Sequence, residues 1–316
     1  MQYKYFEPLS RAWGRMIKAL FKPFDIGKWF AVGFTAFLAH LMEFGNGGGG
    51  NGGKNGRFND FSLHDFFNLP ETISDWMLDN PGLFSLIIFL IILVFVIVII
   101  LTWIGSRGKF MFLDNVVHDR KLVKAPWREF KIQGDSLFLW RVVYFFVILF
   151  IFGFYIWFCY SILQEMYFDY ASNEALITYA IFMGLGLVLM FIITAYIGLF
   201  LNDFVVPIMY KKGQKTMVAW GHFMALFSKA RGYFLLYGLF VLFLFICVVI
   251  LVVLFGLLTC CIGFILLILP YIGSVITLPI SYTFRAFSIE FLEQFGPDYK
   301  YFPDKEGFEV TPESET

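Results

Sequence analysis

Long apolar stretches alternate with polar segments along this chain. Uncharged stretches occupy residues 80–106, 142–164, 175–202 and 232–284. Because a helix needs about 20 apolar residues to cross the hydrocarbon core of a bilayer, each of the first three stretches predicts one transmembrane helix. The fourth is long enough for two helices, joined by a turn near Thr259 to Ile262.

A weaker apolar stretch near the N-terminus predicts one more span. Only residues 29–42 of it are uncharged, so Lys28 and Glu43 would have to extend toward opposite interfaces. A re-entrant or interfacial helix is the alternative for this segment. We therefore predict an all-α integral membrane protein with six transmembrane helices, at about residues 24–44, 81–104, 137–162, 175–200, 233–258 and 263–289.

The composition agrees with a chain that lies mostly in lipid. Hydrophobic residues make up 59% of it, and the mean hydropathy is positive. The pattern predicts one membrane domain, residues 1–297, with an outer loop at 45–80 and an acidic, disordered tail at 298–316. It predicts no separate soluble domain.

The distribution of positive charge predicts the orientation. Most of the 24 Lys and Arg residues lie in the N-terminal segment, at 107–131 or at 211–231, whereas the loop at 164–174 has none. Short cytoplasmic loops keep positive charge. Both termini are therefore expected in the cytoplasm, and the outer loop on the opposite side.

The basic segments share a short pattern centred on Trp. A small residue or Pro precedes the Trp, and an apolar residue follows three positions later, as in Ala12-Trp13, Pro126-Trp127 and Ala219-Trp220. Each copy precedes a predicted pair of spans, which suggests three copies of one amphipathic helix plus one helical hairpin. Chance similarity in a Phe-rich chain is the alternative.

The first amphipathic segment has apolar residues at helical spacing, including Trp13, Met16 and Leu20. Basic residues lie on the other side, so the segment is expected to lie in the headgroup region of the membrane. The functional interpretation is recognition of anionic lipid, and ordinary anchoring is the alternative. The candidate lipid-interface residues are Arg11, Trp13, Arg15, Lys18, Lys22, Trp127, Arg128, Trp220, Lys229 and Arg231.

Two short stretches carry a resemblance to a known group of proteins. Residues 20–25 read Leu-Phe-Lys-Pro-Phe-Asp, and residues 291–297 read Phe-Leu-Glu-Gln-Phe-Gly-Pro. With the six predicted spans, they make the chain resemble uncharacterised bacterial multi-pass proteins similar to the membrane domain of some glycerophosphodiester phosphodiesterases. The resemblance implies a bacterial inner membrane. It carries no catalytic residue, because the phosphodiesterase activity of that family belongs to a separate soluble domain.

No motif in the sequence predicts catalysis, a cofactor or a metal ion. The glycines around Lys54 approach a phosphate-binding loop, but Asn55 stands where Ser or Thr is needed. The four His residues are scattered, although His118 and Asp114 could form a small polar site, for which a solvated juxtamembrane helix is the alternative. The spans contain few ionisable groups, which argues against ion-coupled transport.

Three functions remain open. The favoured one is a non-enzymatic scaffold or accessory subunit that binds lipid or partner proteins. Partners would be other membrane or periplasmic proteins that bind the segment from Phe58 to Asp79, which is rich in aromatic residues, and no nucleic-acid partner is expected. The alternatives are a carrier or channel for lipid or a small apolar solute, and an intramembrane enzyme.

Overall fold

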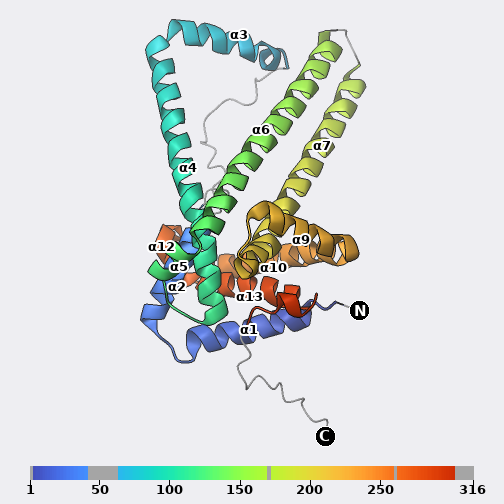
Figure 1. The fold of residues 1–316 in the computed structure, drawn as a ribbon. Helices are drawn as coiled ribbons and strands as arrows, with labels where there is room; N and C mark the ends of the chain where they lie inside the picture. Colours follow the sequence, from blue (N-terminus) through green and yellow to red (C-terminus); the bar gives the residue numbers. More distant parts are fainter. Residues whose placement is uncertain (1–2, 42–62, 169–171, 260–261, 303–316) are drawn as a thin grey trace. The chain divides into compact units, whose positions relative to one another are not determined.

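The fold is known from a computed structural model that describes residues 3–41, 63–168, 172–259 and 262–302. The described chain is helical and contains no β-strand (Figure 1). It divides into two compact units. The first unit comprises 1–39, 106–137 and 198–316, and the second comprises 40–105 and 138–197.

Four helical stretches are long and apolar enough to cross a membrane. They are α4 (Pro81–His118), α6 (Lys131–Phe168), the stretch Glu174–Lys212 and α10 (Arg231–Leu258). The third stretch contains α7 (Asn173–Phe200), the π-helical turn η3 (Leu201–Val205) and α8 (Val206–Lys212). Four of the six predicted spans lie within these stretches, so the chain is an all-α protein with the helices of a membrane protein.

The first predicted span, about 24–44, differs from the expectation. Its helix, α2 (Ile26–His40), has 15 residues, which at 1.5 Å per residue gives a length of about 22 Å. This is shorter than the hydrocarbon core of a bilayer, at about 30 Å. Residues 42–44 of the predicted span lie outside the described part of the chain.

The sixth predicted span, about 263–289, is not one continuous helix. It is divided into α11 (Ile262–Ile268), α12 (Pro270–Ile276) and α13 (Leu278–Glu293). Pro270 and Pro279 lie at the first or second position of α12 and α13. Proline has no N–H to continue a preceding helix, so it is tolerated only near a helix start.

The core of the first unit is formed by helical segments that are buried on all sides. These are residues 106–117 of α4, 204–209 of η3 and α8, and 285–292 of α13. Aromatic rings fill the space between them: the centroid of Phe204 lies 4.8 Å from that of Tyr237 and 5.0 Å from that of Phe234. The remaining helices of this unit are α1 (Phe6–Phe21), α5 (Lys124–Glu129), α9 (Thr216–Lys229) and η4 (Pro297–Tyr299).

The second unit contains a helical hairpin. Residues 138–168 of α6 and 173–197 of α7 lie side by side (Figure 1). The hydroxyl of Tyr155 donates to the carbonyl oxygen of Met183 at 3.0 Å, and the rings of Phe152 and Phe191 are 5.1 Å apart. Most of the apolar side chains on these helices are exposed, as expected of helices that face lipid.

The predicted outer loop contains α3 (Leu63–Asp79). Asn80 and Pro81 begin the next helix, α4, as their types favour. The earlier part of the loop, including Phe58, lies outside the described residues. Residues 298–302 of the predicted disordered tail are ordered against the first unit, where Tyr301 and Phe302 are buried. The rest of the predicted tail, residues 303–316, lies outside the described residues.

Candidate functional site

Helix α1 has a buried face that packs on α13. The two helices contact one another and are drawn side by side in blue and red in Figure 1. The buried residues recur at helical spacing, and they are Pro8, Ala12, Met16, Ala19 and Leu20. Ala12 and Ala19 leave room on this face, and Met16 and Leu20 fill the space against α13.

The outer side of α1 has a separate aromatic face. Phe6 is 76% exposed and Trp13 is 53% exposed, and Phe21 also faces outward. With about 100° between successive residues, these three side chains lie on one stripe, beside the buried face. The helical spacing predicts a single apolar face, and the structure divides it in two because α13 covers only the part that carries Ala12, Met16 and Leu20.

The third face of α1 carries its basic residues. Arg11, Lys18 and Lys22, three of the candidate lipid-interface residues, are exposed. Arg15 is different: its Nε donates to the carboxylate of Glu290, which is buried in α13. The guanidinium of Arg15 also lies 3.8 Å from the ring centroid of Phe302. Arg15 therefore joins α1 to α13 and to the C-terminal segment.

Burial dominates the electrostatics of Glu290. It raises the pKa of this carboxyl above its ordinary value, and the nearby charge of Arg15 opposes that shift. Arg11 lies 3.9 Å from the same carboxylate. The ion pair between Arg15 and Glu290 therefore links α1 to α13 inside the protein and is not a surface ion pair.

The segment 297–302 packs over α8. Lys211 donates to the carbonyl oxygen of Lys300, and its ammonium lies 5.0 Å from the ring centroid of Tyr301. Lys212 lies 5.6 Å from the ring of Tyr299. The backbone N–H groups of Tyr301 and Phe302 donate to Glu293 of α13. Cation–π contacts therefore cover lysines that the charge pattern placed at the inner membrane face.

The remaining candidate lipid-interface residues lie on or next to the other two Trp-bearing helices, α5 and α9. Trp127 of α5 is half-buried and lies 5.2 Å from the guanidinium of Arg107, while Arg128 is exposed. Trp220 of α9 is half-buried against Phe223, and Lys229 and Arg231 are exposed. In every copy the residue before the Trp is buried: Ala12, Pro126 and Ala219. The structure places these Trp residues on separate helices, not in one cluster.

A polar cluster lies in the core of the first unit. Lys109 of α4 donates to the side-chain oxygen of Asn202, and Arg285 of α13 donates to the backbone oxygen of Asn202 at 2.7 Å. Arg285 is only 7% exposed, and its Nε has no hydrogen-bond partner among the described residues. Asn202 belongs to the π-helical turn, a distortion that is common at functional sites.

Other polar groups of α4 are also buried. Arg107 Nη2 donates to both carboxylate oxygens of Asp135, to Oδ1 at 2.8 Å and to Oδ2 at 3.0 Å. Asp114 accepts hydrogen bonds from the hydroxyl of Tyr210 at 2.8 Å and contacts His118 Nδ1 at 3.1 Å. Because Asp114 is buried, the alternative of a solvated juxtamembrane helix is wrong for this residue.

The sequence analysis missed the buried charges of the core. Arg285 lies inside the predicted sixth span, and an Arg within a span is by itself a sign of a specific role. No sequence pattern indicates which residues pair with one another in the core. Arg15 and Glu290, for example, are 275 positions apart. In the described part of the chain, no group of three or more His, Cys, Asp or Glu side chains is placed to hold a metal ion.

Comparison with known proteins gives a family but no characterised relative. No curated protein and no solved structure matches the chain. A model of a family of unknown function, DUF7544, matches residues 3–278, which include α1, all four long apolar stretches, and Lys109 and Asn202 of the polar cluster. The chain therefore belongs to the family of unknown function DUF7544.

Proposed function

We propose that this protein is a non-enzymatic membrane scaffold or accessory subunit that binds anionic lipid through α1. The observation that carries the proposal is the exposed aromatic face of α1, with Trp13 at its centre and basic residues beside it. A helix of this kind lies in the headgroup region with its aromatic side chains toward the hydrocarbon. Each exposed Lys or Arg near anionic lipid contributes roughly 1 kcal/mol.

The proposed topology has six spans in three hairpins. The hairpins are the first predicted span, about 24–44, with α4, then α6 with α7, and α10 with the segment α11–α13, and each follows a Trp-bearing helix. Support for the third comes from its two ends. Phe295, just after α13, lies 4.8 Å from Phe234 at the start of α10. If α10 crosses the membrane, the chain must cross again before it returns to that point.

Orientation and location follow from charge and resemblance. The positive segments favour a cytoplasmic position for both termini. The likeness to the membrane domain of some glycerophosphodiester phosphodiesterases favours a bacterial inner membrane. In this arrangement α3 lies on the periplasmic side, where the segment from Phe58 to Asp79 would contact partner proteins. Residues 58–62 of that segment are outside the described chain.

The packing of α13 favours a scaffold over a carrier or channel. A carrier would need an opening lined by the sixth predicted span. The side chains of Tyr282, Phe287 and Phe291 are instead buried in the first unit, and the rings of Phe287 and Tyr237 stack at 5.3 Å. Such packing supports a rigid core that holds α1 in place.

Site-directed spin labelling in lipid vesicles tests the lipid contact of α1. Single Cys residues are placed at Trp13 and, as a matched control on the charged face, at Lys18, in a background without the native cysteines. The proposal expects the label at 13 to collide with oxygen dissolved in lipid, and the label at 18 to collide with a water-soluble nickel chelate. Equal exposure of both labels to the nickel chelate would contradict it.

Reporter fusions test the topology separately. Reporters fused within residues 45–56 and near Trp127 are expected to report opposite sides of the membrane. Reporters that report the same side would rule out the proposed orientation, and the result does not depend on whether α1 touches lipid.

A further inference from the structure

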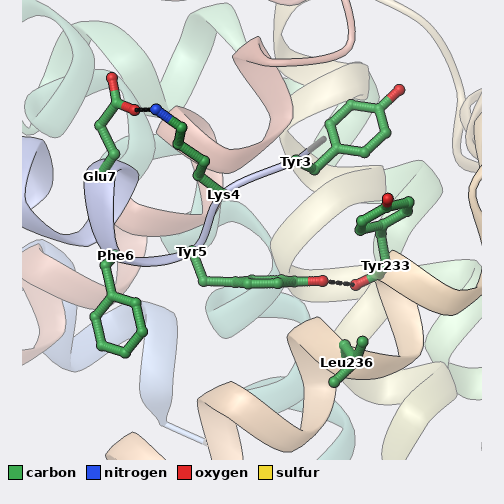
Figure 2. A pocket seen from close by; sticks show the side chains of 7 residues that line it. All are labelled: Tyr3, Lys4, Tyr5, Phe6, Glu7, Tyr233 and Leu236. Carbon is green, nitrogen blue, oxygen red and sulfur yellow. Dashed lines mark hydrogen bonds and ion pairs between the residues drawn. The ribbon is translucent and has the colours of Figure 1, made fainter. Parts of the chain in front are cut away.

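A pocket lies where the N-terminal segment meets α10. Its volume is about 550 Å³, and its lining comes from residues 3–7 together with Tyr233 and Leu236 of α10. Figure 2 shows Tyr5 reaching across to Tyr233, with Leu236 on one side of its ring and the rings of Tyr3 and Tyr233 on the other. The hydroxyl of Tyr5 donates to the carbonyl oxygen of Tyr233 at 3.1 Å.

The walls of this pocket are held in place by the first unit. The backbone of Lys4 exchanges hydrogen bonds with the side chain of Gln294, each at 2.9 Å. The ring of Tyr3 stacks on Phe295 at 4.4 Å, and the ring of Tyr5 stacks on Phe291 at 5.6 Å. The pocket is thus formed before any ligand binds, which lowers the entropy cost of binding.

The polar end of the pocket is lined by Lys4 and Glu7, and Arg11 contacts Glu7 from outside the lining. Glu7 pairs with Lys4 at 3.1 Å and with Arg11, so one carboxylate faces two cations. These contacts, with the hydrogen bond from Lys4 first, lower the pKa of Glu7, which keeps it ionised at neutral pH. Lys4, Arg11 and Glu7 together leave one positive charge beside the pocket, which matches the single negative charge of a phosphodiester.

The apolar end of the pocket continues along α10. Leu236, Leu239, Phe243 and Ile250 recur at helical spacing and are all exposed. Leu236 lies in the second turn of a helix that is long and apolar enough to span a membrane. The pocket therefore opens where α10 enters the hydrocarbon in the proposed topology.

From this combination we infer that the pocket binds one glycerophospholipid. Its phosphodiester lies beside Lys4 and Arg11, the tyrosine rings surround the glycerol region, and one acyl chain follows the exposed face of α10 from Leu236 onward. The inference rests on the proposed function, since it requires α10 to be in the membrane. It goes further by assigning a single lipid to a defined site.

Native mass spectrometry of the full-length protein tests the assignment. The detergent-purified, delipidated protein is titrated with phosphatidylglycerol, with diacylglycerol and with soluble glycerol phosphate. Leu236→Trp fills the pocket and should weaken phosphatidylglycerol binding about tenfold, whereas Leu242→Trp, on another exposed face of α10, should leave it unchanged. Lys4→Gln should weaken phosphatidylglycerol about fivefold without weakening diacylglycerol.

The outcomes separate the possible ligands. Equal lipid binding by the Leu236→Trp and wild-type proteins, or no lipid binding by the wild type, would overturn the inference. Binding of glycerol phosphate as tight as that of the lipid would show a site for free phosphate and would also overturn it. Thermal unfolding of each variant, unchanged from the wild type, shows that the loss is not due to misfolding. If the spin label at 13 still reports hydrocarbon, such a failure leaves the proposed function standing.

Discussion

The hydroxyl of Tyr237 donates a hydrogen bond to Asp203 Oδ2 at 3.0 Å, which joins α10 to the π-helical turn. Tyr237 is fully buried, and its ring packs against Phe204, the residue after Asp203. One side chain therefore makes both an aromatic and a polar contact with the same turn. Asp203 is half-buried, so a donor from the protein replaces part of the water that its carboxylate loses.

Removing that hydroxyl tests its contribution. Tyr237→Phe keeps the ring but leaves Asp203 with one donor fewer, so we expect the free energy of unfolding to fall by about 1–2 kcal/mol. Thermal unfolding in detergent measures the effect. Tyr3→Phe, whose ring is stacked on Phe295 at the surface, is the control and should change little. A Tyr237→Phe protein as stable as the wild type would show that the bond adds nothing.

The ion pair between α1 and α13 gives a second prediction. The side chain of Glu290 is 1% exposed, so Arg15→Met leaves a buried carboxylate without its partner. We expect a loss of about 2–3 kcal/mol in the free energy of unfolding, at the lower end for a buried pair because Arg15 is itself 24% exposed. Arg11→Met, at a 55% exposed side chain, should cost less than about 1 kcal/mol.

The double variant completes this test. Arg15→Met with Glu290→Met removes both charges and replaces them with apolar groups, which is often nearly neutral. We therefore expect the double variant to be more stable than Arg15→Met alone. A double variant that is less stable than either single variant would contradict the view that the cost comes from an unpaired buried charge.

The raised pKa of Glu290 predicts how stability depends on pH. Above the ordinary value of 4.5, the unfolded chain has released this proton while the folded protein still binds it. Protonation then favours folding, so the contribution of Glu290 to stability falls as pH rises from about 4.5 through the folded pKa, and is constant above it. Unfolding measured from about pH 4 to about pH 7 should show this fall in the wild type but not in Glu290→Gln. Parallel curves for the two proteins would exclude it.

A glycine in α4 gives a fourth prediction. A Cβ added at Gly108 would lie 2.7 Å from the backbone carbon of Leu38 in α2, closer than atoms can pack. We expect Gly108→Ala to lower the free energy of unfolding by about 1–3 kcal/mol through overpacking. Gly221 in α9 has no atom within 4 Å of such a Cβ, so Gly221→Ala should raise stability by up to about 1 kcal/mol. Chemical unfolding of both variants makes the comparison, and two equal effects would contradict it.

Hydropathy predicted the long helices, but it could not predict the buried polar core. Residues 80–106 and 175–202 lack charge, so length and composition suffice for α4 and α7. Lys109 and Arg107 read as positive charge at a membrane face, because nothing local shows that other helices surround them. Their burial depends on Asn202 and Asp135, which lie far away in the sequence.

The candidate site was partly predictable in the same sense. The spacing of basic and apolar residues predicted the helix α1 and, as a hypothesis, its contact with lipid. Which apolar residues face inward depends on α13, so Trp13 and Met16 could not be assigned to different faces from spacing alone. The pocket beside Lys4 had no sequence signal, because its walls come from segments more than 200 positions apart.

The contact between α1 and α13 has a consequence for how the chain is made. Translation produces α1 before α13, so the inner face of α1 lacks this partner until α13 has left the ribosome. Arg15 must wait for Glu290, which is synthesised 275 residues later. A ribosome that stalls before α13 would release a chain with its long helices complete and its first helix still unpaired, a species suited to recognition by membrane quality-control proteases.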